Sequence, residues 1–179
     1  LPDYFLAKPI QWFFGGDVNI GFTFYMFLLP VIVFLLTYFV FYVLVGDTVL
    51  ALSGSLFLNG GLFFGLLGRM PSPTFNIIFW LTLFYFLFKF AKEGKKTFAV
   101  FSTLNFGLLF YIYTYYWTFF AVFLIVFAVF GKIFIQNFKF KPYVCILGGG
   151  FLIGIPYFWD MLNSAKLSYY AESLARLGM

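Results

Sequence analysis

The sequence predicts an all-α fold, a multi-pass transmembrane helical bundle, on three observations. About 64% of the 179 residues are hydrophobic, 27% are aromatic and only 9% are charged, whereas soluble domains are about 45–50% apolar and about 25% charged. The apolar residues form runs of about 20, the length a helix needs to cross a bilayer at 1.5 Å per residue. A soluble domain of this size could not bury 32 Phe, 13 Tyr and 4 Trp.

The composition excludes a soluble enzyme, a disulfide scaffold, a disordered chain and a nucleic-acid-binding module. The chain has no histidine, so it holds neither a Ser-His-Asp or Cys-His catalytic group nor a histidine metal site. The single Cys145 lies in an apolar run and is expected to be a small buried side chain. We predict no organic cofactor and no nucleic-acid partner, and we leave a divalent metal open. We attribute the net charge of +5 to membrane orientation.

The whole chain, residues 1–179, is predicted to form a single transmembrane domain of six spans. Residues 1–19 are amphipathic and are expected to form a helix in the outer membrane interface. The spans are predicted at residues 20–45, 48–67, 76–91, 97–112, 115–131 and 142–159, and an outer segment follows at residues 160–179. Pro71 and Pro73 are expected to hold the segment before the third span as a stiff loop.

Two of these boundaries rest on specific residues. The turn pair Gly46-Asp47 separates the first two spans. The uncharged stretch 97–131 would be about 52 Å long as one helix, which is too long for a single span. Tyr111–Trp117 (YIYTYYW) lies at its midpoint, where interfacial aromatic residues indicate a turn. We therefore predict two helices there.

The charges predict the orientation of the spans. Six spans place one group of connections on the same side, with a net charge of +5 from Asp47, Glu93 and seven lysines, namely Lys89, Lys92, Lys95, Lys96, Lys132, Lys139 and Lys141. The other side carries four basic and four acidic residues. The positive-inside rule makes the lysine-rich side cytoplasmic. We therefore expect a multi-pass protein of the plasma (inner) membrane.

The charged residues of the outer side predict a reaction surface there. Arg69 lies close to Ser72 and the two prolines, where a stiffly held guanidinium could bind a phosphate through two hydrogen bonds. A membrane-anchoring role for Arg69 is the alternative. Near the C-terminus, Arg176 is expected either to contact an anionic substrate or to pair with Glu172 four residues before it. Tyr169 and Tyr170 would stack on a sugar or a lipid.

Two GxxxG patterns, Gly61–Gly65 and Gly150–Gly154, predict close helix packing. No ionisable residue lies in the middle of a span, which disfavours ion pumps and proton relays. A transporter or flippase for a lipid or an uncharged solute stays open as an alternative. Its path would need the polar residues Ser53, Ser55, Asn59, Ser102, Thr103 and Asn105. A membrane scaffold without a ligand is a further alternative.

The order of these features resembles the membrane part of the GT-C glycosyltransferases, which include protein O-mannosyltransferases, aminoarabinose transferase and oligosaccharyltransferase. Four features carry the resemblance: the segment PDYFLAKPIQWFFGGD, the Arg69-x-x-Ser72-Pro73 loop, the basic inner turn, and the run GLLFYIYTYYWTF at Gly107–Phe119. The ending YYAESLARLGM is similar to an outer segment of bacterial members. The resemblance covers nearly the whole chain.

The resemblance implies an enzyme that transfers a sugar from a polyprenyl-phosphate-linked donor to an acceptor at the outer face of the membrane. It implies that Arg69 contacts the donor phosphate. From their place in the outer segments, we expect Ser72, Tyr169, Tyr170, Glu172 and Arg176 to be further substrate-binding residues. An acidic residue of the first outer loop acts as the base in this family, and Asp3 is the candidate in this chain. Because the family's base follows a further span, we expect the chain to be a fragment that is inactive alone. Some members use a divalent metal and others none.

Overall fold

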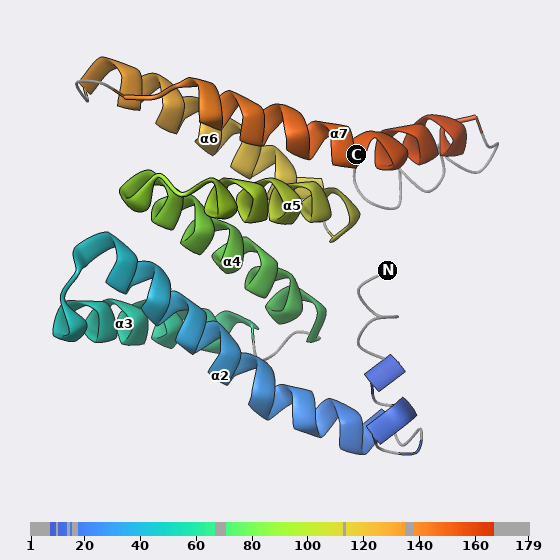
Figure 1. Ribbon diagram of the computed structural model, residues 1–179. Helices are drawn as coiled ribbons and strands as arrows, with labels where there is room; N and C mark the ends of the chain where they lie inside the picture. The colour runs from blue at the N-terminus through green and yellow to red at the C-terminus, as the bar shows by residue number, and fades with distance from the viewer. Residues whose placement is uncertain are drawn as a thin grey trace.

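The computed structural model describes residues 8–9, 11–13, 15, 18–66, 71–112, 114–134 and 138–166. Within these ranges the chain is helical apart from short connections and contains no strand (Figure 1). The all-α class is therefore confirmed for this part of the chain. The helices are α2 (Val18–Val45), α3 (Thr48–Leu66), α4 (Pro71–Glu93), α5 (Lys96–Ile112), α6 (Thr114–Phe134) and α7 (Lys141–Ser164).

Each of these helices covers one of the predicted segments. The stretch 97–131 is divided between α5 and α6, and residue 113 between them lies outside the described residues. Helices long and apolar enough to cross a membrane are Asn19–Val45, Tyr116–Phe134 and Lys141–Ser164. Six crossings stay a prediction. Of the predicted interfacial segment, only residues 8–9 and 11–13 are described as helical, and Trp12 and Phe13 are exposed there.

The start of α4 differs from the sequence-based expectation. Pro71 and Pro73 were expected to lie in a loop, but α4 begins at Pro71 and so includes both. Proline is compatible with the first turn of a helix, because the amide hydrogens it lacks have no partner within the helix at those positions. The expectation of a loop up to residue 75 is therefore wrong.

Two tight turns reverse the chain at the same end of the molecule. Gly46 after α2 and Gly94 after α4 have φ angles of +79° and +67°, which favour glycine. Each donates its N–H to the last turn of its helix, Gly46 to Tyr42 O and Gly94 to Phe90 O. Asp47 then caps α3 by accepting the N–H of Leu50 at 2.8 Å.

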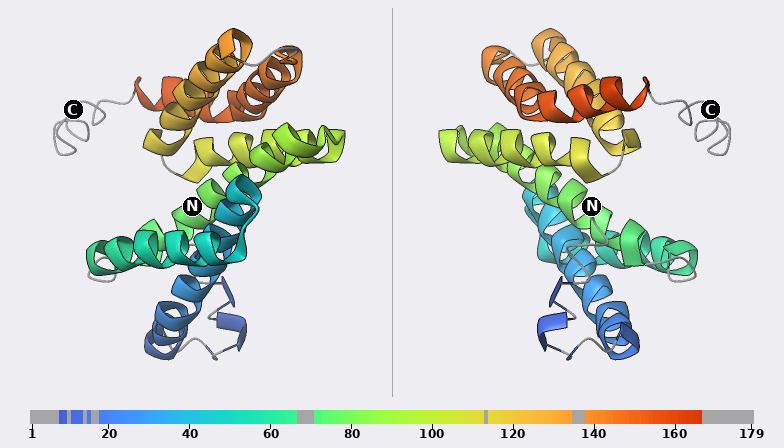
Figure 2. Two further views of the ribbon diagram at one scale, coloured as in Figure 1. Left: turned by 90° about the vertical axis from the view of Figure 1, so that its left-hand side faces the viewer. Right: turned by 90° about the vertical axis from the view of Figure 1, so that its right-hand side faces the viewer.

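The helices form two groups joined through α4. Helix α2 packs against α3 and α4, and α4 also packs against α5. Helix α5 packs in turn against α6 and α7 (Figures 1 and 2). The hydrophobic core lies mainly around α4, α5 and α6, where the fully buried side chains include Leu83, Leu87, Phe106, Leu109, Phe110, Phe120 and Leu124.

Glycines bring α5 and α7 close together. A β-carbon at Gly154 would lie 2.8 Å from the Phe110 ring, and one at Gly107 would lie 2.6 Å from Ile153. A β-carbon at Gly150 would overlap the Phe106 ring. The close packing predicted from Gly150–Gly154 is thus confirmed. Gly61 and Gly65 lie in α3, but their surroundings are outside the described residues.

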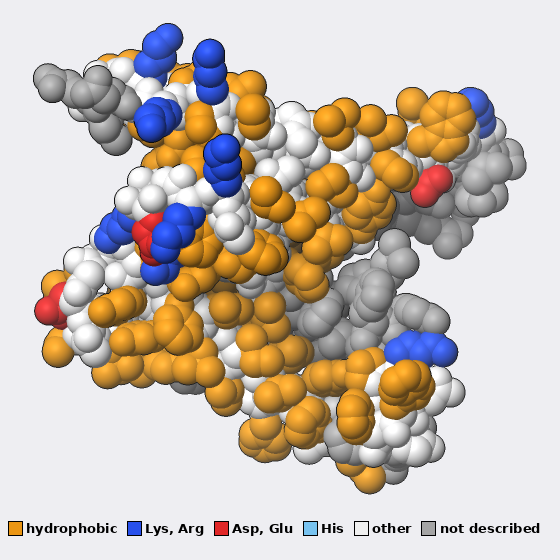
Figure 3. All heavy atoms as spheres, in the orientation of Figure 1, with side chains coloured by type: hydrophobic (Ala, Val, Ile, Leu, Met, Phe, Trp, Pro, Cys, Tyr) orange, Lys and Arg blue, Asp and Glu red, His pale blue; other side chains and the backbone are white. Residues whose placement is uncertain are grey.

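The outward surface of the helices is largely apolar. Phe27, Phe57 and Leu152 are 75%, 87% and 68% exposed, and Figure 3 displays apolar side chains over most of this face of the molecule. Continuous exposed apolar surface is unfavourable in water and is typical of helices in contact with lipid. Cys145 also points outward and is exposed, so its expected burial is wrong. The buried face of α7 passes instead through Tyr143, Ile146, Gly150 and Gly154.

Candidate functional site

Most of the site residues predicted from the sequence lie outside the described residues. These are Asp3, Arg69, Tyr169, Tyr170, Glu172 and Arg176. Ser72 belongs to the first turn of α4, but its side chain is outside the described part. The structure therefore does not test whether these residues come together. It does describe most of the helix segments next to them.

Three connections, two of which carry lysines, gather at one end of the molecule, which we call the lysine-rich end (residues 46–47, 89–96 and 132–141). Figure 1 places the α2–α3, α4–α5 and α6–α7 connections on the same side, and Figure 3 shows most of the Lys and Arg side chains of this view there. Lys92 Nζ on α4 donates to Leu44 O at the end of α2, 3.2 Å away. The predicted topology requires this arrangement, because it places these three connections on the same side of the membrane.

In the half of the bundle toward the lysine-rich end, three buried serine and threonine hydroxyls have partners within their own helices. Thr37, Ser55 and Ser102 are at most 1% exposed. Each donates to the carbonyl four residues earlier in its own helix, namely Val33 O, Ala51 O and Phe98 O, at 2.7–2.9 Å. These side chains are satisfied without any group from outside their helix.

In the opposite half, four buried polar atoms of described residues have no hydrogen-bond partner: Asn59 Oδ1, Asn76 Oδ1, Trp80 Nε1 and Trp117 Nε1. We call this set the unpaired polar group. Asn59 and Asn76 are only 3% and 5% exposed. A buried polar atom without a partner costs about 1–3 kcal/mol, so such atoms are rare. Their concentration in one half marks that half as the candidate site.

Asn76 and Trp80 are four residues apart and therefore share one face of α4. The Trp80 ring packs edge-on against Phe84, with centroids 4.5 Å apart, and lies 5.7 Å from Phe119 of α6. An acceptor, a donor and aromatic surface thus occur together on one helix face. This combination suits an uncharged ligand that carries hydroxyl groups.

Trp117 belongs to α6 and stacks on Phe110 of α5, with ring centroids 4.6 Å apart. Near it, Tyr111 donates its hydroxyl hydrogen to Ile153 O of α7 at 2.7 Å. Sequence reasoning named Asn59 only for a transport path and did not select Asn76, Trp80 or Trp117. No sequence pattern separates a paired from an unpaired buried polar atom.

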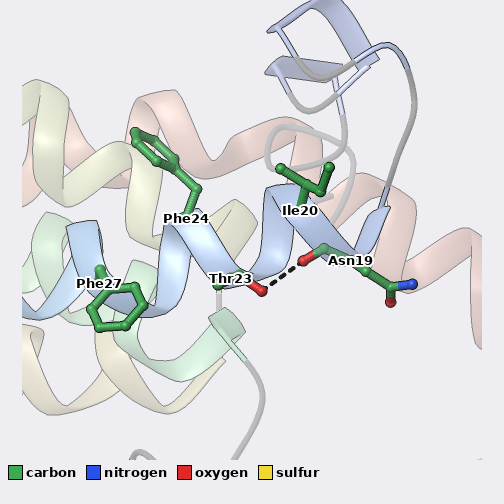
Figure 4. A pocket seen from close by; sticks show the side chains of 5 residues that line it. All are labelled: Asn19, Ile20, Thr23, Phe24 and Phe27. Atoms are coloured by element: carbon green, nitrogen blue, oxygen red, sulfur yellow. Dashed lines mark hydrogen bonds between the residues drawn. The ribbon is translucent and has the colours of Figure 1, made fainter.

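An open recess of about 430 Å³ lies along the first turns of α2, also in the half away from the lysine-rich end. Its described lining comprises Asn19, Ile20, Thr23, Phe24 and Phe27 (Figure 4). Thr23 donates to Asn19 O at 2.9 Å, so its hydroxyl is satisfied within the helix. The remaining lining is mostly apolar, which suits a hydrocarbon chain.

The polar residues expected for a transport path do not come together. Ser55 and Asn59 lie on α3, which packs against α2, whereas Ser102 and Thr103 lie on α5, which packs against α4, α6 and α7. Thr103 and Asn105 donate to carbonyls of their own helix. Among the described residues, no group of three or more His, Cys, Asp and Glu side chains could hold a metal ion.

No protein-family model, curated protein or solved structure matches the chain. The described fold defines an all-helical chain with helices long and apolar enough to cross a membrane. The resemblance to GT-C glycosyltransferases therefore stays a prediction from the sequence motifs.

Proposed function

We propose that the chain crosses a membrane six times, with the lysine-rich end in the cytoplasm and residues 1–19 in the outer interface. Two observations support this topology. The shortest of the six helices α2–α7 is α5, which has 17 residues and is about 26 Å long, close to the thickness of the hydrocarbon core. The lysine-bearing connections also lie together at one end, as the positive-inside rule requires.

Within this topology, we propose that the chain is the membrane part of a glycosyltransferase that uses a polyprenyl-phosphate-linked sugar. The unpaired polar group carries this proposal, because its atoms lie in the outer half, where such a donor presents its headgroup. Amide and indole groups beside aromatic rings bind sugar hydroxyls without needing a charge. The GT-C-like order of motifs in the sequence supports the same activity.

The residues take separate roles in this proposal. Asn76 Oδ1 accepts a hydrogen bond from a hydroxyl of the donor sugar, and Trp80 Nε1 donates one. The apolar recess on α2 receives part of the polyprenyl chain. Arg69, which follows α3 in the sequence, contacts the donor phosphate. The base that activates the acceptor is an outer acidic residue, with Asp3 as the candidate in this chain.

The test measures sugar transfer by the full-length protein from a radiolabelled polyprenyl-phosphate sugar. We expect Arg69→Ala to lower both transfer and donor affinity while the protein stays folded. We expect Asn76→Leu to lower transfer as well, because it removes the acceptor from the site. Thr37→Val is the matched control, since Thr37 is equally buried but hydrogen-bonded within its helix, and it should leave transfer unchanged.

Two results would contradict the proposal. One is unchanged donor affinity in both Arg69→Ala and Asn76→Leu. The other is the absence of any polyprenyl lipid from protein purified in mild detergent, together with no transfer activity in the full-length enzyme.

A further inference from the structure

The lysines of the lysine-rich end form two groups that differ in their partners. At the end of α4, Glu93 accepts hydrogen bonds from Lys89 Nζ at 2.8 Å and Lys95 Nζ at 2.7 Å. These bonds lower the pKa of the Glu93 carboxyl below its ordinary value. Lys92 donates to the backbone carbonyl of Leu44. Three of the four lysines in this group, Lys89, Lys92 and Lys95, therefore already have a hydrogen-bond partner within the protein.

The second group, Lys132, Lys139 and Lys141 around the α6–α7 connection, has no acidic residue close in the described chain. The described acidic residues are Asp47, Glu93 and Asp160. Asp160 lies 19 residues after Lys141 on the same helix, a distance of about 28 Å. Asp47 belongs to the α2–α3 hairpin, which packs on α4, and Glu93 is taken by the first lysine group.

Aromatic packing holds the second group in place. Phe138 stacks on Tyr143, with centroids 5.0 Å apart and ring planes 10° apart. Tyr143 also lies 5.5 Å from Phe90 of α4 and 5.5 Å from Phe127 of α6. Phe138 covers Gly131, where a β-carbon would collide with its ring. Phe138 and Tyr143 thus join the described end of the connection to α4, α6 and α7.

Exposed apolar side chains surround these lysines. On α6, Phe130, Ile133 and Phe134 are 56%, 67% and 73% exposed, and Val144 on α7 is 46% exposed. Lys132 Nζ lies 6.0 Å from the centroid of the Phe140 ring. Uncompensated positive charge beside exposed apolar surface fits a ligand with a phosphate at one end and hydrocarbon at the other.

We propose that Lys132, Lys139 and Lys141 bind the phosphate of an anionic phospholipid, whose acyl chains lie along the exposed faces of α6 and α7. This site is separate from the unpaired polar group and does not depend on the glycosyltransferase activity. Each lysine contributes electrostatic attraction to the headgroup, which amounts to about fivefold in affinity per lysine. Removal of all three should weaken binding about a hundredfold.

The test titrates the detergent-solubilised full chain with phosphatidylglycerol and counts bound lipids by native mass spectrometry, with phosphatidylcholine as the neutral reference. The variant is Lys132→Gln/Lys139→Gln/Lys141→Gln. The matched control, Lys89→Gln/Lys92→Gln/Lys95→Gln, removes the same charge from the same end but from lysines that have partners. The arginine variant Lys132→Arg/Lys139→Arg/Lys141→Arg keeps the charge and checks that the site depends on it. Thermal unfolding of every variant without lipid confirms that it is folded.

We expect phosphatidylglycerol to bind the wild type more tightly than phosphatidylcholine, and the glutamine variant to lose this preference. The control and the arginine variant should keep most of it. Equal loss in the control, or no loss in the glutamine variant, would overturn the proposal. Inorganic phosphate is added as a competitor: if it displaces the lipid at equal concentration, the site binds a free anion and the phospholipid assignment is wrong.

Discussion

The two halves of the bundle treat their buried polar side chains in opposite ways. Toward the lysine-rich end, Thr37, Ser55 and Ser102 each bond to a carbonyl of their own helix. Toward the other end, Asn59 and Asn76 are as deeply buried, yet their carbonyl oxygens have no partner. Under the proposed function, the unpaired atoms of the second half would bind the ligand, whereas the paired hydroxyls of the first half would not.

The two halves also differ in the kind of polar group that they contain. Glu93, Lys89 and Lys95 bond to one another at the lysine-rich end. In the described part of the other half, the buried polar atoms without a partner are uncharged amides and indoles. Uncharged groups are easier to bury in a membrane than ions are, so they are suited to hold a polar headgroup within a bundle.

The largest expected effect concerns the packing of α5 against α7. Gly150→Leu places a side chain where Phe106 already lies, so α5 and α7 must separate. We expect the free energy of unfolding to fall by about 3 kcal/mol. Thermal unfolding in detergent measures this effect.

Gly148→Leu on the same helix is the control for that substitution, because a β-carbon there meets nothing within 4 Å. It should change stability little. Equal destabilisation by the two variants would mean that helix propensity, rather than the α5–α7 contact, decides the result.

The next prediction is an increase in the free energy of unfolding. Asn76→Leu removes an unpaired buried carbonyl and keeps a side chain of similar size, so the ligand-free protein should become more stable by about 1–2 kcal/mol. Thr37→Val removes a hydroxyl that already has a partner and should bring no such gain. Chemical denaturation of both variants without donor lipid makes this comparison. A loss of stability in Asn76→Leu would contradict the unpaired state of this side chain.

A smaller effect tests the indole N–H of Trp80, the hydrogen-bond donor of the same half. Trp80→Phe removes the indole N–H but keeps an aromatic ring against Phe84. We expect the dissociation constant of the polyprenyl-phosphate sugar to rise about fivefold, the value of one hydrogen bond of about 1 kcal/mol. Trp159→Phe, at a position 66% exposed, is the control. Equal dissociation constants for the wild type and Trp80→Phe would remove Trp80 from the site.

The smallest effect tests the lysine-rich end. The pKa of Glu93 is lowered by the hydrogen bonds from Lys89 and Lys95. A lowered pKa means that the carboxylate stabilises the fold at neutral pH and that this contribution disappears as the pH falls through the lowered pKa. We therefore expect the melting temperature to drop slightly with acidification in the wild type. In Glu93→Gln this drop in melting temperature with acidification should be absent.

The positions of the helices were largely predictable from the sequence, because runs of apolar residues and turn residues act locally. Gly46-Asp47 predicts a turn because glycine adopts positive φ angles and aspartate caps helices. The structure places a left-handed glycine and a helix cap there. The division of 97–131 into α5 and α6 followed from length and from the position of Tyr111–Trp117. The start of α4 was mispredicted because a proline pair fits both a loop and a first helical turn.

The candidate site was far less predictable. Whether Asn76 Oδ1 or Trp80 Nε1 has a partner depends on which side chains of other helices face it, and no local pattern encodes that. The sequence drew attention to charged residues, since charges stand out in an apolar chain. The unpaired polar group consists of uncharged residues, and nothing in the sequence distinguishes them from other Asn and Trp residues of the helices.

The two-residue turn at Gly46-Asp47 also sets how the α2–α3 hairpin can move. Because the link is so short, a separation of the two helices would require a rotation about this turn. Helix α3 has 19 residues, so a rotation of about 10° at the turn would shift its far end by about 5 Å. Gly94 is a similar pivot between α4 and α5. A rotation of this kind would displace the end of α3 beyond Asn59 the most and would leave the turn at the lysine-rich end in place.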